Sequence, residues 1–231
     1  MKTYITIDIE TIPQDINDFS EKQLKYLLKD CKTDEEQNAK QTEFGLSALT
    51  GKICCIGVNI TKNEHNSQSI AFLLGQHENN TSSNVYSYAE NEKTLLNNFW
   101  SYISEEISKS KNILFITFNG RSFDFPFIMM RSAINEITPL YNLMGGSRWN
   151  YSDNHIDLVD EFTFMGTTKR YNLDYYTSIF GITSPKQKGI DGSSVNSMFK
   201  EGLITEIGDY CIRDIEATRD LFFKWKKIMN K

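Results

Sequence analysis

The sequence of 231 residues has few cysteines, no long apolar run and no excess of positive charge. Its four cysteines form no C-x-x-C pair, and Cys54 and Cys55 are adjacent in an apolar stretch. We therefore expect reduced thiols in the core, not disulfides or a zinc site. No apolar segment approaches the length of a transmembrane helix. The net charge of −5 argues against a protein that coats nucleic acid without specificity.

The first residues also lack the features of a signal peptide. A signal peptide has a basic segment followed by an apolar one, whereas residues 1–4 lead directly into a predicted strand that contains acids. We therefore expect a cytoplasmic protein with no membrane partner.

What the sequence contains is typical of a globular α/β protein. Apolar residues make up 39% of the chain and charged residues 24%, which are ordinary values for a folded soluble domain. The length suits one large domain, so we treat 1–231 as a single unit. Residues 15–43 are polar and charged with only a weak helical spacing of leucines, and we interpret this segment as an insertion or lid, not as a separate domain.

The spacing of apolar residues predicts five strands and four main helices. Strands are expected at 3–9, 51–60, 65–74, 112–119 and, as a short edge strand, 154–160. Helices are expected at 89–108, 123–134, 171–181 and 203–227. This order predicts an α/β fold with a mixed five-stranded sheet and helices on both of its faces.

The stretch TIDIETIP, residues 6–13, places Asp8 and Glu10 two positions apart in a predicted strand. Residues two apart in a strand point to the same face, so buried carboxylates there would repel each other and lose hydration. A bound divalent cation would reverse this penalty, and oxygen ligands suit Mg²⁺ or Mn²⁺. The alternative is an exposed, solvated strand end, because so short a motif also occurs by chance.

A second acidic segment, FNGRSFDFPFIMM, follows the predicted strand at 112–119. Asn119 and Asp124 lie there, near the carboxyl end of a strand, where ligands collect in α/β sheets. The alternative for Asp124 is a favourable interaction with the dipole of the helix that it opens.

The third segment is YCIRDIEATRD, on the last predicted helix. Tyr210 and Asp214 are four residues apart and therefore share one face. The rest of that face is apolar, so Asp214 points inward and needs a partner. A salt bridge or a hydrogen bond to Tyr210 is the alternative to a metal ion.

The three motifs in this order resemble the DEDDy class of 3′–5′ exonucleases of the RNase H-like superfamily. The segments DIETIP, NGRSFDFP, HIDL, GIDGSSV and YCIRDIEAT look most like stand-alone relatives of the proofreading domain of family B DNA polymerases. The resemblance runs from residue 3 to about residue 223, with the insertion at 15–43 as its least typical part. It implies an RNase H-like fold and a single 3′–5′ exonuclease domain.

The resemblance implies two divalent cations, Mg²⁺ or Mn²⁺, held by Asp8, Glu10, Asp124 and Asp214. Asp8 would contact both ions, Glu10 and Asp214 would complete the site that activates water, and Asp124 would serve the second ion. Tyr210 would orient the attacking water.

The family pattern also implies contacts with nucleic acid. Thr11 and Ile12 would flank the terminal nucleotide, and Asn119 and Phe123 would contact the adjoining strand; core packing is the alternative for Ile12 and Phe123. The segment 186–194 is a candidate wall of the cleft. Six basic residues lie in the right region, most of them expected to be solvated and one or two to meet phosphates: Arg121, Arg148, Lys169, Arg170, Lys186 and Lys188. His155 is interpreted as structural, and Asp157 is considered for a supporting role.

We therefore expect a metal-dependent 3′–5′ exonuclease that hydrolyses phosphodiester bonds from the 3′ end of single-stranded nucleic acid, with DNA favoured. The alternatives are a catalytically inactive nucleic-acid-binding scaffold and an enzyme that trims RNA 3′ ends. Only 17 residues follow Asp214, so we expect any proofreading to act in trans, with a polymerase or repair complex as partner.

Overall fold

A mixed sheet of six strands forms the centre of the computed structural model, which describes residues 2–62, 64, 66–76, 82–110, 112–145, 154–184 and 192–229. The strands are β1 (Thr3–Pro13), β2 (Gly51–Lys62), β3 (Asn66–Leu74), β4 (Val85–Ala89), β5 (Ile113–Thr117) and β6 (His155–Asp157). Their order is β4-β3-β2-β1-β5-β6. β2 runs antiparallel to both of its neighbours, whereas β5 and β6 are parallel to β1.

The expected α/β class and the helices on both faces are confirmed, but the prediction of five strands is wrong. The sixth strand is β4, which pairs in parallel with β3 at the edge of the sheet. Most of β4 is exposed or only partly buried, so it lacks the apolar signal of a core strand. The expected edge strand at 154–160 also ends early, because α5 (Leu158–Phe162) begins directly after β6.

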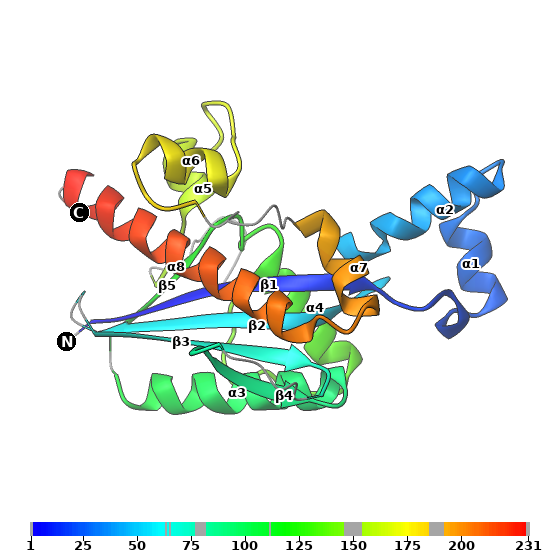
Figure 1. Ribbon diagram of the computed structural model, residues 1–231, viewed down its shortest axis with the longest axis horizontal. Coiled ribbons are helices and arrows are strands. Elements are labelled where there is room, and N and C mark those ends of the chain that lie inside the picture. Colours follow the sequence, from blue (N-terminus) through cyan, green and yellow to red (C-terminus); the bar gives the residue numbers. More distant parts are fainter. Residues whose placement is uncertain are drawn as a thin grey trace.

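Helices cover both faces of the sheet (Figure 1). One face carries α8 (Ile204–Met229), which crosses β1, β2 and β3, and the opposite face carries α3 (Glu92–Ser108). The body of the fold also contains the shorter helices α4 (Asp124–Ile134), α6 (Leu173–Ile179) and α7 (Val195–Lys200). None of the helices within the described ranges is both long and apolar enough to cross a membrane.

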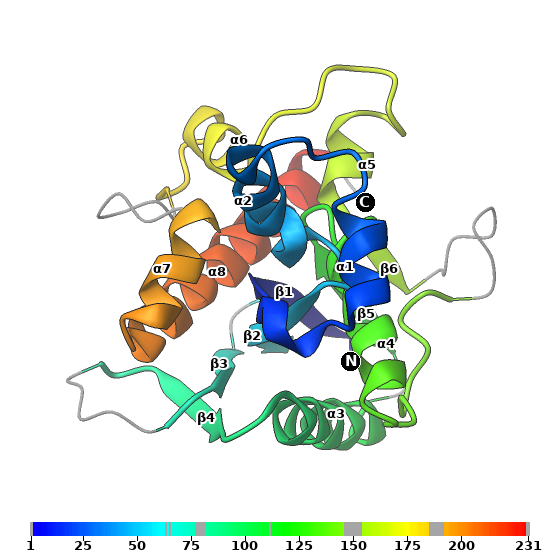
Figure 2. The same cartoon turned by 90° about the vertical axis from the view of Figure 1, so that its right-hand side faces the viewer.

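The polar segment at 15–43 forms two short helices, α1 (Glu21–Leu27) and α2 (Asp34–Thr42). Neither helix has a fully buried residue. They project from the end of β1, away from the body of the sheet (Figures 1 and 2). Local caps rather than core packing define them: Ser20 forms a capping box with Gln23, and Thr33 caps α2.

A buried ion pair joins the helices on the α3 side of the sheet. Arg131 of α4 donates to Glu92 of α3, with 2.5 Å between Nη2 and Oε2, and both side chains are buried. The same carboxylate accepts a bond of 2.7 Å from the backbone N–H of Ile53 in β2. Because every charge is paired and hydrogen-bonded, this ion pair fixes the position of α4 relative to the sheet.

On the opposite face, α8 lies very close to β2 because residue 57 is a glycine. A Cβ added at Gly57 would lie 2.7 Å from Cys211 Sγ and 3.1 Å from Ile215 Cγ2, both of α8. Gly57 pairs with Asp8 across the β1–β2 ladder. The missing side chain therefore determines how closely α8 approaches the acidic part of β1.

Replacing Gly57 with alanine should destabilise the protein by about 1–3 kcal/mol, the usual cost of overpacking a core. Alanine at Gly192 is the control, because no heavy atom lies within 4 Å of a Cβ added there. Urea denaturation followed by circular dichroism measures both variants. An unchanged midpoint for Gly57→Ala would show that α8 does not depend on this contact.

Candidate active site

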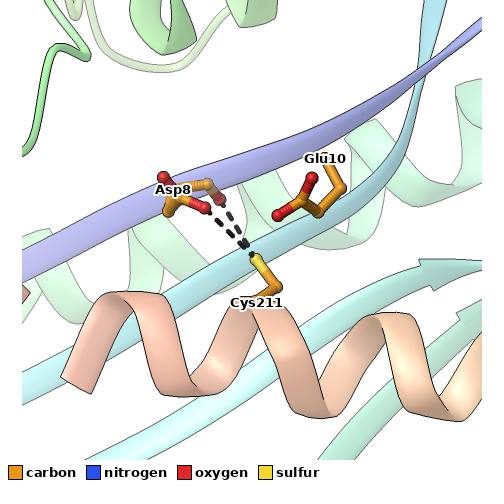
Figure 3. A group of neighbouring side chains, drawn as sticks. All are labelled: Asp8, Glu10 and Cys211. Carbon is orange, nitrogen blue, oxygen red and sulfur yellow. Dashed lines mark hydrogen bonds between the residues drawn. The ribbon is translucent and has the colours of Figure 1, made fainter. Parts of the chain in front are cut away.

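Asp8 and Glu10 project from β1 toward α8, on the same face of the strand (Figure 3). Glu10 is only 8% exposed, which excludes the solvated strand end that its motif alone allowed. Cys211 of α8 faces them, and one ligand atom from each of these three residues lies within 4.8 Å of the others. Two carboxylates, that of Asp8 partly buried and that of Glu10 buried, are thus held close together.

A β-bulge follows Glu10 directly. Glu10 pairs with Cys55, whereas Thr11 pairs with Ile53, so Cys54 is an extra residue on β2. The Cys54 thiol donates to the backbone carbonyl of Glu10, with 3.4 Å between Sγ and O. Since a bulge increases local twist and redirects the side chains beside it, this irregularity sets the direction of β1 just beyond the acids.

Asp124 reaches the same strand from its other edge. β5 pairs with β1 only as far as Thr6, and beyond this point the backbone N–H of Ile9 donates to Asp124 Oδ1 at 2.9 Å. Ile9 lies between Asp8 and Glu10, so this bond brings the third predicted ligand beside the first two. Asp124 also begins α4, as its alternative interpretation required, but its carboxylate is buried against β1.

The turn that delivers Asp124 is held by Asp157 at the end of β6. The carboxylate of Asp157 accepts from the backbone N–H groups of Asn119 and Arg121, at 2.8 and 2.9 Å. Gly120 must be a glycine here, because an added Cβ would lie 2.5 Å from Thr117 Cβ. The supporting role considered for Asp157 therefore has a structural basis in this turn.

Tyr210 and Asp214 lie on the inward face of α8, and both side chains are buried. The Tyr210 phenol hydrogen-bonds the Asp214 carboxylate, so the alternative partner considered for Asp214 is present. Burial, and then the negative charges of Asp214, Glu10 and Asp8, raise the pKa of the phenol above its ordinary value. Tyr210 is therefore a neutral hydrogen-bond donor among carboxylates.

The four acids repel one another. The pKa of Asp8 is raised by burial first and then by Asp124, Asp214 and Glu10, and that of Glu10 by burial, Asp214 and Asp124. Burial also raises the pKa of Asp124 to about 7, against the opposing effect of the bond from Ile9. The groups with the largest effects on Asp8 and Glu10 are carboxylates and a thiol, and oxygen donors in such a cluster fit Mg²⁺ or Mn²⁺.

Cys211 is the site residue that the motifs did not identify. Its Sγ lies 3.8 Å from Asp8 Oδ2, within reach of a thiol hydrogen bond. A bond with Cys55, burial and the nearby carboxylates raise the pKa of the thiol, which keeps it neutral and makes it a donor to Asp8. Its position three residues before Asp214, on the same face of the helix, was the available signal.

The four residues predicted to contact nucleic acid differ in their surroundings. The Thr11 hydroxyl donates to the carbonyl of Gly45 at 2.7 Å, and Ile12 is buried in the core. Ile12 also lines a cavity of about 490 Å³ between the insertion and α7. Asn119 has a positive φ of 71° in the turn before α4, and the ring of Phe123 packs 5.4 Å from that of Phe127. Ile12 is therefore largely a core residue, and Phe123 is partly one, as the alternative interpretation allowed.

The basic residues predicted to meet phosphates also differ in their surroundings. Arg121 is paired with Asp160 at 2.9 Å, whereas Lys169 and Arg170 are exposed. Arg148, Lys186, Lys188 and most of the segment 186–194 lie outside the described residues. His155 is buried, and burial lowers its pKa to about 3, in keeping with its interpretation as structural.

Residues 53–231 match the family described as predicted 3′–5′ exonucleases related to the exonuclease domain of PolB. The chain belongs to this family. Asp124, Tyr210 and Asp214 fall within the matched part of this PolB-related exonuclease, whereas Asp8 and Glu10 precede it. No curated protein matches the chain in sequence. The resemblance drawn from the motifs is thus confirmed, as is the α/β architecture, which is consistent with an RNase H-like fold. An exonuclease domain of this kind implies dependence on divalent metal ions.

Without metal, the protein should lose stability as the pH rises from about 4 to about 7. The pKa of Asp124 is about 7 in the folded chain against 3.8 ordinarily, so its protonated form favours the folded state and ionisation disfavours it. Adding Mg²⁺ or Mn²⁺ at pH 7.5 should raise the melting temperature again. Thermal melts in EDTA and in each metal measure both effects.

Asp124→Asn is the matched variant for these melts, because it removes the titrating group. Its stability should fall less between pH 4 and pH 7 than that of the unaltered protein. If the stability of the two proteins changed identically with pH, ionisation of Asp124 would not be the cause of the loss.

Proposed function

We propose that this protein is a metal-dependent 3′–5′ exonuclease acting on single-stranded 3′ ends, with DNA as the favoured substrate. The observation that carries the proposal is the convergence of carboxylates from β1, α4 and α8, whose negative charges raise the pKa values of Asp8, Glu10 and Asp124. An inactive scaffold would have no evident reason to retain so costly a cluster, since buried like charges oppose folding.

In this proposal Asp8, Glu10, Asp124 and Asp214 hold two divalent cations, Mg²⁺ or Mn²⁺. Such ions, when bound, lower the pKa of a water molecule and stabilise the attacking and leaving oxygens of a displacement at phosphorus. The chain keeps the donors in place: Ile9 holds Asp124 through its backbone N–H, and the Cys211 thiol lies within hydrogen-bond distance of Asp8. A covalent nucleophile is not required.

Tyr210 has a positioning role in this proposal. The raised pKa of its phenol makes it unsuitable as a general base near neutral pH. Its hydroxyl donates to Asp214, so the phenol oxygen is left to accept a hydrogen bond from the attacking water and to orient that water. Thr11, Ile12, Asn119 and Phe123 would hold the last nucleotides of the strand beside it.

Incubation with 5′-labelled DNA and RNA oligonucleotides in Mg²⁺ or Mn²⁺ should shorten them stepwise from the 3′ end, and EDTA should abolish the reaction. Asp214→Asn should lower the rate by about 10³-fold, because each lost metal contact removes several kcal/mol of transition-state stabilisation. Asp220→Asn, an exposed change on the same helix, should keep the wild-type rate.

Circular single-stranded DNA distinguishes the rival functions in the same assay. It should stay intact, since it has no 3′ end, and cutting it as fast as linear DNA would refute an exonuclease. Binding of linear strands without any shortening, in every metal, would identify an inactive scaffold. If only the RNA oligonucleotides were shortened, the substrate would be RNA and not DNA.

Tyr210→Phe should lower the rate constant of cleavage by about 10- to 100-fold, the cost of a poorly oriented reactant. Metal-induced stabilisation should persist, because the four carboxylates remain. Single-turnover cleavage and a Mn²⁺ thermal shift measure the two properties. A rate equal to that of the unaltered protein would remove Tyr210 from the mechanism.

A further inference from the structure

Exposed tyrosines and cations gather at the start of α6. Tyr171 and Tyr175 are 38% and 48% exposed, and their rings stack with 4.6 Å between centroids and an interplanar angle of 21°. Lys169 Nζ lies 5.0 Å from the centre of the Tyr171 ring, and Arg170 is exposed beside it. We call these four residues the α6 platform.

Most of the charge on the α6 platform is available to a ligand. Within the described ranges, neither Lys169 nor Arg170 has a carboxylate within ion-pair distance. Exposed cations thus lie beside the stacked rings of Tyr171 and Tyr175. Their combination is the chemistry with which proteins hold a single strand, through stacking on bases and attraction to phosphates.

Aromatic contacts connect the α6 platform to the candidate active site. Tyr171 packs 6.0 Å from Tyr176, and Tyr176 packs 5.9 Å from Phe118. Phe118 directly precedes Asn119, in the turn that leads to Asp124. A second link is the ion pair of Arg121 in that turn with Asp160 of α5. The platform and the turn are therefore parts of one packed region.

The topology places both on the same edge of the sheet. β1, β5 and β6 are parallel, so their carboxyl ends lie together, and α5 and α6 follow the end of β6. Figures 1 and 2 show α5 and α6 beside α8, on the face of the sheet that carries the acids. The helix α6 and the acids of β1 therefore both lie next to α8.

We propose that the α6 platform is a second contact for single-stranded nucleic acid, several nucleotides before the 3′ end. Bases stack on Tyr171 and Tyr175, and phosphates meet Lys169 and Arg170. This inference rests on the proposed exonuclease function for the identity of its ligand. It makes affinity depend on the length of the strand, because a very short strand cannot span the site and the platform together.

The test is the affinity of labelled oligothymidines of 3 and 12 nucleotides, measured by fluorescence anisotropy in EDTA so that no cleavage occurs. Tyr171→Ser combined with Tyr175→Ser should weaken binding of the 12-mer about tenfold or more, as expected for lost base stacking. Binding of the 3-mer should stay the same. Lys169→Gln with Arg170→Gln should lower the slope of log affinity against log salt by about 1.

Tyr26→Ser is the matched control. Tyr26 is 71% exposed on α1, and Lys29 Nζ lies 5.1 Å from its ring, so its chemistry resembles that of Tyr171. This variant should bind the 12-mer normally. Equal loss in the control, or unchanged 12-mer binding in both platform variants, would overturn the inference. The inference would also be overturned if the platform variants lost binding to anionic lipid vesicles while their binding of DNA stayed unchanged.

Failure of the inference can be told from failure of the proposed function. Hydrolysis of the p-nitrophenyl ester of thymidine 5′-monophosphate in Mn²⁺ reports the chemical site alone, since this substrate is too small to reach α6. If the protein cleaves the ester and the oligonucleotides while platform variants bind every length normally, only the inference is wrong. Melting curves establish that the variants are folded, and the charge variants decide the question if the tyrosine pair is destabilising.

Discussion

Repulsion among buried carboxylates is the constraint on which this structure depends. Asp8, Glu10 and Asp124 each have a raised pKa for the same two reasons, loss of water and the nearness of other acids. Such a cluster opposes folding, so the surrounding packing must hold it in place. A pair of divalent cations would turn the same repulsion into strong binding, which is the physical link between the fold and the proposed chemistry.

Three local features of the fold bring these carboxylates together. β5 ends early relative to β1, which leaves the N–H of Ile9 to bind Asp124. Gly57 lets α8 approach the sheet closely enough to bring Asp214 to the acids of β1. Asp157 holds the backbone of the turn that carries Asp124. The first feature holds the Asp124 carboxylate directly and the other two position the backbone that carries the acids, so the site is positioned by rigid elements of the sheet and its flanking helices.

The sequence predicts the parts of the site that follow from periodicity. Asp8 and Glu10 share a strand face, and Tyr210 and Asp214 share a helix face, because each spacing matches the repeat of its element. It could place Cys211 on the helix face of Asp214, but the contact of Cys211 with Asp8 and the bond from Ile9 to Asp124 join segments far apart in the chain and could not be predicted. β4 was missed because an edge strand that is mostly exposed has a weak apolar pattern, although its Val-Tyr-Ser-Tyr sequence favours a strand.

The most direct test of the account is anomalous diffraction from crystals of the protein soaked in Mn²⁺. Two manganese peaks among the carboxylates of Asp8, Glu10, Asp124 and Asp214 are the predicted result. Absence of manganese from this cluster in crystals where it binds elsewhere on the protein would contradict the central claim, because the repulsion among these acids would then serve no cation.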